Sequence, residues 1–248
     1  MRGRSIALLL AALLSTLSAE AATADELPGA GFSNHLALAL GFGYGGLPSM
    51  TSDEAYVAAE NQSLQAQGWN VSGAADPSSE LHAALSLTYY GPYWTTLRVG
   101  AEVSFFEPNE QGTPPGGALN VITNYGGIVE LPILVGLHYA VANDRLVVEL
   151  MGGPDVTLLT MSGLDSTDLT GNPRLVGDTV VGFDGILGLH YLVSPLFSVG
   201  AEVGYRALQT GPLRASDATT PYLTPGGQNV NLNFSGFRGL LDLAIVVL

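Results

Sequence analysis

Apolar residues occupy every second position in long stretches of this chain. Period-two alternation of this kind predicts β-strands with one apolar face and one small or polar face. Eight segments show it, namely Asn34–Tyr44, Glu80–Tyr90, Trp94–Phe106, Tyr125–Val141, Arg145–Met161, Thr179–Val193, Leu196–Leu208 and Phe234–Leu248. We therefore predict an all-β chain in which consecutive strands pair.

The connections between these segments alternate in length. Tight turns such as Gly91-Pro92-Tyr93 and Ser194-Pro195-Leu196 alternate with long polar loops rich in Gly and Pro. Bacterial outer-membrane barrels have short periplasmic turns and long outer loops, and their strands need about nine to eleven residues to cross a bilayer. The pattern predicts an eight-stranded antiparallel up-and-down transmembrane β-barrel over residues 34–248.

Charged residues keep to one face of each predicted strand. In the third segment Arg98 and Glu102 oppose a face that includes Val99 and Phe105. The charged residues that share the non-apolar face predict an ion-pair network inside the barrel, made of Arg98, Glu102, Glu130, Glu149, Asp184, Glu202, Arg206, Arg238 and Asp242. The same face carries the lumenal histidines His82, His138 and His190. Glu202 and Asp242 share a similar depth on sequential strands, as do Arg206 and Arg238, and we expect the two carboxylates to lie close together.

Alternation alone also fits a soluble periplasmic barrel of the lipocalin type, with its apolar face inside. The sizes of the residues instead favour a barrel whose apolar face points outward, toward lipid. One face is mostly Leu, Val, Phe and Tyr, which is too bulky for the interior of eight strands, whereas the other is mostly Gly, Ala and Ser with isolated charges.

Aromatic residues concentrate at both ends of the predicted strands, where amphipathic rings meet the two bilayer interfaces. Near the short turns these girdle residues are Tyr89, Tyr93, Trp94, Tyr139, Tyr191 and Phe197, with Tyr90 beside them. Near the long loops they are Tyr44, Phe105, Tyr125, Tyr205 and Phe237.

Residues 1–21 combine Arg2 and Arg4 with the apolar run Ile6–Leu17 and a small-residue end at Ala21, which predicts a cleaved secretory signal peptide. Ala24 is the alternative cleavage site. Residues 22–33 are then a short periplasmic linker. The chain has no Cys and no Lys, so thiol, disulfide and lysine chemistry are excluded. Its formal charge of −14 makes it a poor binder of nucleic acid.

The sequence Val-Gly-Ala-Glu-Val occurs at Val99–Val103 and again at Val199–Val203, each time after a short turn that contains proline. In strand number, loop alternation and girdles, residues 34–248 resemble the small eight-stranded outer-membrane proteins of the OmpX, OmpW and OmpA-barrel types. The resemblance implies a Gram-negative outer membrane, with lipid, lipopolysaccharide, periplasmic chaperones and the barrel-assembly machinery as partners.

We expect a structural or surface-interaction role without catalysis, cofactor or metal. The acidic loops suit adhesion or ligand capture. One alternative is a narrow channel that prefers cations or carries small hydrophobic molecules. Another is an enzyme that modifies lipid A, for which His82, with Ser79 and Glu80 near it in sequence, is the candidate base. The sequence shows no outward Ser–His pair, so a lumenal histidine paired with a carboxylate is favoured over catalysis.

Overall fold

The computed structural model describes residues 33–46, 58, 61–62, 64–72, 79–107, 110–117, 120–142, 144–163, 174–212, 214, 226–229 and 231–247. The predicted signal peptide and the linker up to residue 32 lie outside these residues. No helix in the described part of the chain is long and apolar enough to cross a membrane.

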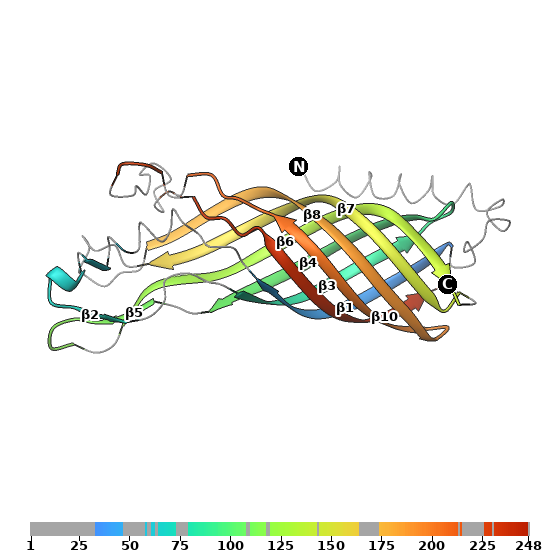
Figure 1. The fold of residues 1–248 in the computed structure, drawn as a ribbon, viewed down its shortest axis with the longest axis horizontal. Coiled ribbons are helices and arrows are strands. Elements are labelled where there is room, and N and C mark those ends of the chain that lie inside the picture. The colour runs from blue at the N-terminus through green and yellow to red at the C-terminus, as the bar shows by residue number, and fades with distance from the viewer. Residues whose placement is uncertain are drawn as a thin grey trace, which may run out of the picture.

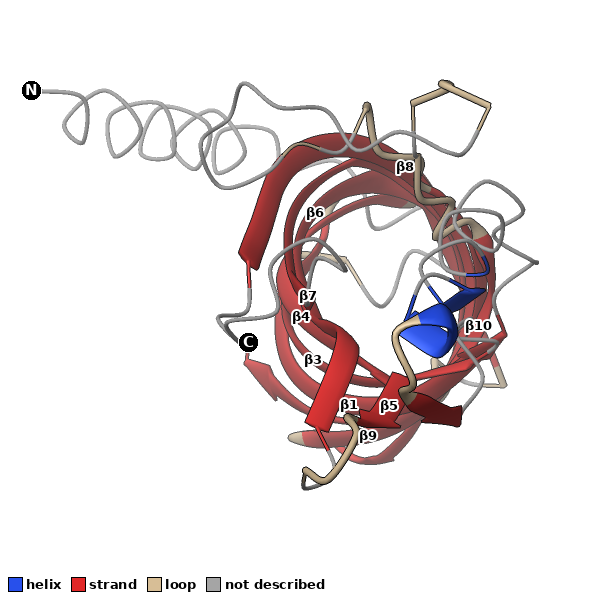
Figure 2. Ribbon diagram, turned by 90° about the vertical axis from the view of Figure 1, so that its left-hand side faces the viewer, coloured by secondary structure: helices blue, strands red, loops and turns tan. Residues whose placement is uncertain are grey.

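Eight long strands close into a barrel (Figure 1). They are β1 (His35–Gly46), β3 (Ser79–Tyr90), β4 (Thr95–Glu107), β6 (Asn120–Val141), β7 (Leu146–Gly163), β8 (Arg174–Ser194), β9 (Phe197–Ala207) and β10 (Gly236–Val247). Each pairs antiparallel with the next, and β10 pairs with β1. Figure 2, viewed along the barrel, shows the resulting ring. Closure pairs each of these eight strands on both sides, and the predicted fold class is confirmed.

The connections differ at the two ends of the barrel. In the turn between β3 and β4, Gly91 N–H donates to the Thr95 carbonyl at 2.7 Å. At the other end, β2 (Asn70–Ser72) pairs with β5 (Glu110–Thr113), and β5 pairs with β6. These pairings extend the sheet beyond the barrel mouth (Figure 1). The sequence did not predict β2 and β5 because strands this short show no measurable period.

The strand register is continuous through both prolines that interrupt the sequence pattern. Pro132 pairs with Asp155 and Pro154 pairs with Phe183, with no bulge at either position. The irregularity in the pairing of β6 with β7 lies instead between Asn124 and Gly127, near the long loops. Between that irregularity and the short turns, one set of alternate residues therefore faces the interior.

The exterior of the barrel is apolar. Phe237 is 75% exposed and Leu241 is 69% exposed, and large aliphatic side chains of every barrel strand share this surface. Among the strand side chains that the structure describes, no Asp, Glu or Arg points outward. Small residues such as Ala37, Ala84 and Ala244 face inward instead, which leaves room for long charged side chains.

The predicted girdle residues lie as follows. Exposed rings are those of Tyr44, Tyr93, Phe105, Tyr139, Tyr191, Phe197, Tyr205 and Phe237, while Tyr89 and Trp94 are half-buried. Tyr205 and Phe237 stack edge to face with centroids 5.0 Å apart. The side chain of Tyr125 is not among those described. Tyr90 was wrongly grouped with the girdle, because it shares the parity of His82 and is buried inside the barrel.

Candidate functional site in the barrel lumen

The interior side chains form two charged clusters. The upper cluster, nearer the long loops, consists of Glu80, His82, Glu102, Glu130, Asp155, Asp184, Arg206 and Arg238. The lower cluster, nearer the short turns, consists of Tyr90, Arg98, Glu149, His190, Glu202 and Asp242. Alternation places both on the inner face, because a strand side chain and the one two residues along point the same way.

Arg206 is the centre of the upper cluster. Its Nη1 donates to Glu130 Oε1 at 2.6 Å and its Nη2 donates to Glu80 Oε1 at 2.7 Å. Its Nε donates to the Phe234 carbonyl at 2.9 Å. The guanidinium is 1% exposed, so β9 is joined to β3 and β6 by charge-assisted hydrogen bonds in a dry environment.

Arg238 connects the remaining acids of the upper cluster. Its Nη1 donates to Glu102 Oε2 at 2.5 Å and lies 3.5 Å from Glu130 Oε2, and its Nη2 lies 3.0 Å from Asp184 Oδ2. Both arginines therefore contact Glu130, in keeping with their similar depth on neighbouring strands. Asp155 is held separately, accepting from Leu131 N–H and the Thr157 hydroxyl at 3.0 and 2.9 Å.

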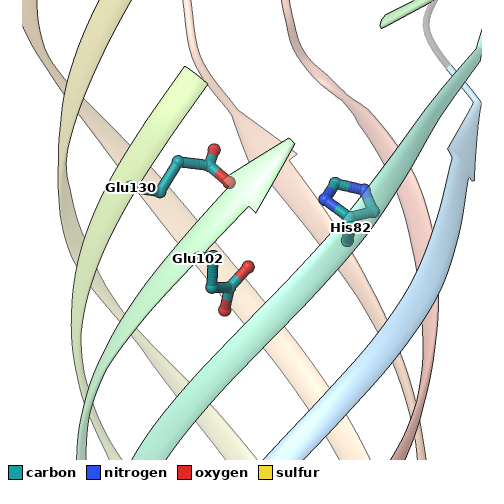
Figure 3. Close-up of side chains that lie close together, drawn as sticks. All are labelled: His82, Glu102 and Glu130. Carbon is teal, nitrogen blue, oxygen red and sulfur yellow. The ribbon is translucent and has the colours of Figure 1, made fainter. Parts of the chain in front are cut away.

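His82 lies between a serine and a carboxylate. Its Nδ1 is 2.8 Å from Ser104 Oγ, and its Nε2 is 3.0 Å from Glu80 Oε1. Figure 3 shows its imidazole beside the carboxylates of Glu102 and Glu130, all three extending inward from adjacent strands. A serine–histidine–acid line resembles a hydrolase triad, yet Ser104 is fully buried and its hydroxyl also donates to Glu130. The Ser104 hydroxyl is therefore shielded from any substrate in this structure.

The lower cluster is organised by Arg98. Its Nη1 lies 2.7 Å from Glu202 Oε1, its Nη2 donates to Glu149 Oε2 at 3.1 Å, and its Nε donates to Thr88 Oγ1 at 3.0 Å. The Tyr90 hydroxyl donates to the other oxygen of Glu149. Each carboxylate oxygen can accept twice, so Glu149 and Glu202 keep acceptor capacity after these contacts.

His190 faces three carboxylates of the lower cluster. Its Nε2 is 3.6 Å from Glu149 Oε1 and 3.5 Å from Glu202 Oε1, and its Nδ1 is 3.4 Å from Asp242 Oδ1. Glu202 and Asp242 thus contact the same imidazole. The third lumenal histidine, His138, lies apart from this cluster, with its Nδ1 3.0 Å from Thr96 Oγ1.

Apolar layers separate and close the clusters. Leu134, Met151 and Ile186 pack together between the charged residues of β6, β7 and β8. Another layer, which includes Tyr90 and Val147, fills the turn end. Between the clusters lies a cavity of about 10 Å³ that Glu102, Glu202 and Arg238 help to line, which is room for roughly one water. At the level of the two clusters, the described side chains therefore fill the lumen apart from this cavity.

Three residues of the clusters were not assigned to the network from sequence. Glu80 was considered only beside His82, and Asp155 and Tyr90 were not placed inside. The signal was present in each case, since Glu80 and Tyr90 share the parity of His82, and Asp155 shares the parity of Glu149. What parity could not supply is the pairing, because partners lie up to 136 residues apart in sequence.

No family model and no curated protein sequence matches this chain. The solved structures that are similar to this chain include the following three. OprG, an outer membrane protein of Pseudomonas aeruginosa, has a TM-score of 0.49 and 16% identity, covering 87% of this chain and 96% of OprG. Neisserial surface protein A has a TM-score of 0.46 and 13% identity, covering 87% and 97% of the two chains. Ail, the attachment invasion locus protein of Yersinia pestis, has a TM-score of 0.46 and 9% identity, covering 87% and 100%. The eight-stranded antiparallel barrel that the sequence predicted is the fold of this chain itself.

Proposed function

We propose that this chain is an integral outer-membrane protein with a structural or surface-interaction role and no catalysis. The observation that supports this proposal most directly is that apolar and charged side chains lie on opposite faces of the barrel. Leu, Val, Ile and aromatic residues cover the outside, and the described strand carboxylates and guanidinium groups are inside. Water would leave that apolar exterior unstable, whereas a bilayer solvates it.

The filled lumen supports a structural role over a wide pore. The ion pairs of Arg98, Arg206 and Arg238 occupy the interior, and apolar layers lie between and below them. The extension formed by β2, β5 and β6 supports the surface role, because it places folded backbone beyond the barrel mouth (Figure 1). On this proposal the partners are outer-membrane lipid and lipopolysaccharide, with chaperones and the assembly machinery during export.

A narrow cation-preferring path is the second candidate. It is favoured by one observation: the described lumen holds eight carboxylates, those of Glu80, Glu102, Glu130, Glu149, Asp155, Asp184, Glu202 and Asp242, against three guanidinium groups. An interior with this imbalance repels anions. The small cavity limits any such path to low conductance.

A charge placed on the apolar exterior tests the membrane assignment. We expect Leu241→Arg to lower the free energy of unfolding from lipid vesicles by about 2–4 kcal/mol, the cost of an arginine near the bilayer midplane. Gln228→Arg, at an exposed loop position, is the matched control and should lower stability much less, because its charge meets water rather than lipid. Urea titration followed by Trp fluorescence measures both.

A second test combines cell fractionation with gel electrophoresis of the unboiled and boiled protein. The wild-type chain should be found in the outer-membrane fraction and run faster before boiling than after. A soluble chain with unchanged mobility, or a Leu241→Arg variant as stable as Gln228→Arg, contradicts the proposal.

A further inference from the structure

The lower cluster carries more negative charge than its arginine balances. Arg98 is the guanidinium that pairs with Glu149 and Glu202, whereas Asp242 contacts His190, and each of these acids is at least nine-tenths buried. Buried charges without compensation are very costly. With His190 neutral, as a metal-ligating imidazole must be, three carboxylates against one guanidinium leave two negative charges, which one divalent cation would balance.

The donor atoms of the cluster converge on one point. Glu149, His190 and Glu202 each offer one ligand atom, and these three atoms lie within 4.8 Å of one another. His190 Nε2 lies 3.6 and 3.5 Å from the two carboxylate oxygens. Donors bound at 2.0–2.1 Å to one tetrahedral zinc ion are about 3.3 Å apart, so a small adjustment brings all three within range.

His190 supplies a separate indication of a ligand. The residue is 5% exposed, and its Nε2 makes no hydrogen bond although it points between two carboxylates. Its other nitrogen faces Asp242, whose oxygens also make no hydrogen bond. A carboxylate behind the far nitrogen of a histidine orients the ring and raises its basicity in metal sites.

Two glycines make space for this arrangement. Gly188 lies between Glu149 and Glu202 in the sheet, pairing with both, and a Cβ there would be 2.9 Å from His190 Nε2. A Cβ on Gly200 would collide with His190 Nδ1 and with Asp242. The imidazole can reach its position only because both residues lack side chains.

We propose that the lower cluster binds one divalent transition-metal ion of the zinc type through Glu149, His190 and Glu202, with Asp242 orienting His190. An imidazole donor favours zinc and similar ions over calcium and magnesium, which prefer all-oxygen sites. The bound ion joins β7, β8 and β9 near the turn end and neutralises the cluster.

The upper group His82, Glu102 and Glu130 also brings three donors within 4.8 Å. It is the weaker candidate because two guanidinium groups, rather than one, already contact its carboxylates. Arg238 contacts Glu102 and Glu130, and Arg206 donates to Glu130. His82 Nδ1 also lies 2.8 Å from the Ser104 hydroxyl, which holds the imidazole away from a metal ion. Comparing the two groups therefore gives the experiment its internal control.

The test is a calorimetric titration of Zn²⁺ into the metal-free, folded full-length barrel in detergent. We expect one tight site per chain. H190Q removes it, whereas H82Q and H138Q, the other two lumenal histidines, retain it. D242N weakens it by about 10- to 100-fold, the usual effect of losing a carboxylate behind a ligating histidine. Mobility before and after boiling checks that each variant is folded.

A second measurement does not depend on the folding of H190Q. In ¹⁵N-histidine-labelled wild type, Zn²⁺ should shift the Nε2 resonance of one histidine, and G188A should abolish that shift. The proposal is overturned if wild type binds no Zn²⁺, if H82Q loses the site while H190Q keeps it, or if all three histidine variants bind equally. The last result would place binding at acidic groups elsewhere.

Discussion

At the scale of single residues, the repeated sequence Val-Gly-Ala-Glu-Val shows how position decides what a residue does. Gly200 in the second copy lies against His190 and Asp242, and no side chain fits there. Gly100 in the first copy is less confined, since a Cβ would meet the Leu85 carbonyl at 3.2 Å and Pro132 at 3.4 Å. Identical sequence therefore meets different neighbours on β4 and β9.

This difference predicts unequal costs for the same substitution. G200A should lower the free energy of unfolding by about 1–3 kcal/mol, because the added methyl displaces a buried ion pair. G100A should stay within about 1 kcal/mol of wild type, since its milder crowding is offset by the lower flexibility of alanine in the unfolded chain. Urea titrations in lipid vesicles compare them, and equal losses would argue against the described packing of Gly200.

At the scale of elements, the interior ion pairs link strands that are not neighbours in the sheet. Arg206 on β9 contacts Glu80 on β3 and Glu130 on β6, on the opposite side of the barrel. Backbone hydrogen bonds hold each strand only to its two neighbours. These cross-barrel contacts therefore add a set of constraints that the sheet itself does not provide.

Removing the hub of the upper cluster should be costly. We expect R206M to destabilise the barrel by about 3–5 kcal/mol, because it leaves Glu80 and Glu130 buried without their partner. R145M, at an exposed position in the turn between β6 and β7, is the control and should have no effect. Adding E80Q to R206M should recover part of the loss, which separates uncompensated charge from lost packing. A loss in R206M that E80Q does not relieve would assign the effect to packing.

The elements themselves follow closely from the sequence, and their contacts do not. Period-two alternation predicted all eight barrel strands because each has one lipid-like and one lumenal face, and such faces leave a regular pattern. It also assigned Arg98, Glu149 and His190 to one face. It could not predict that Arg98 contacts Glu149 and Glu202, because that depends on strand register and rotamers around the closed ring. The short strands β2 and β5 left no pattern to detect.

At the scale of the whole molecule, the barrel distributes its side chains in the opposite way to a soluble protein. Its apolar surface is outside, and its polar groups pack in the centre with small residues and apolar layers. Carboxylates outnumber guanidinium groups in both clusters, so the excess negative charge extends through the described lumen and is not confined to one site. On the proposals made above, protons or a metal ion compensate this excess, and the excess favours cations in any ion flow.

Conduction across a planar bilayer tests that consequence. We expect low conductance, because the cavity between the clusters has room for roughly one water. Under a salt gradient, the reversal potential of any residual current should have the sign expected for a pathway that prefers cations. E102Q and E202Q change two acids that line this cavity and should reduce that preference, whereas E110Q, on β5 beyond the barrel mouth, is the control. Large steady openings would contradict a lumen filled by side chains. A reversal potential of the sign expected for anions would contradict the excess of carboxylates in the lumen.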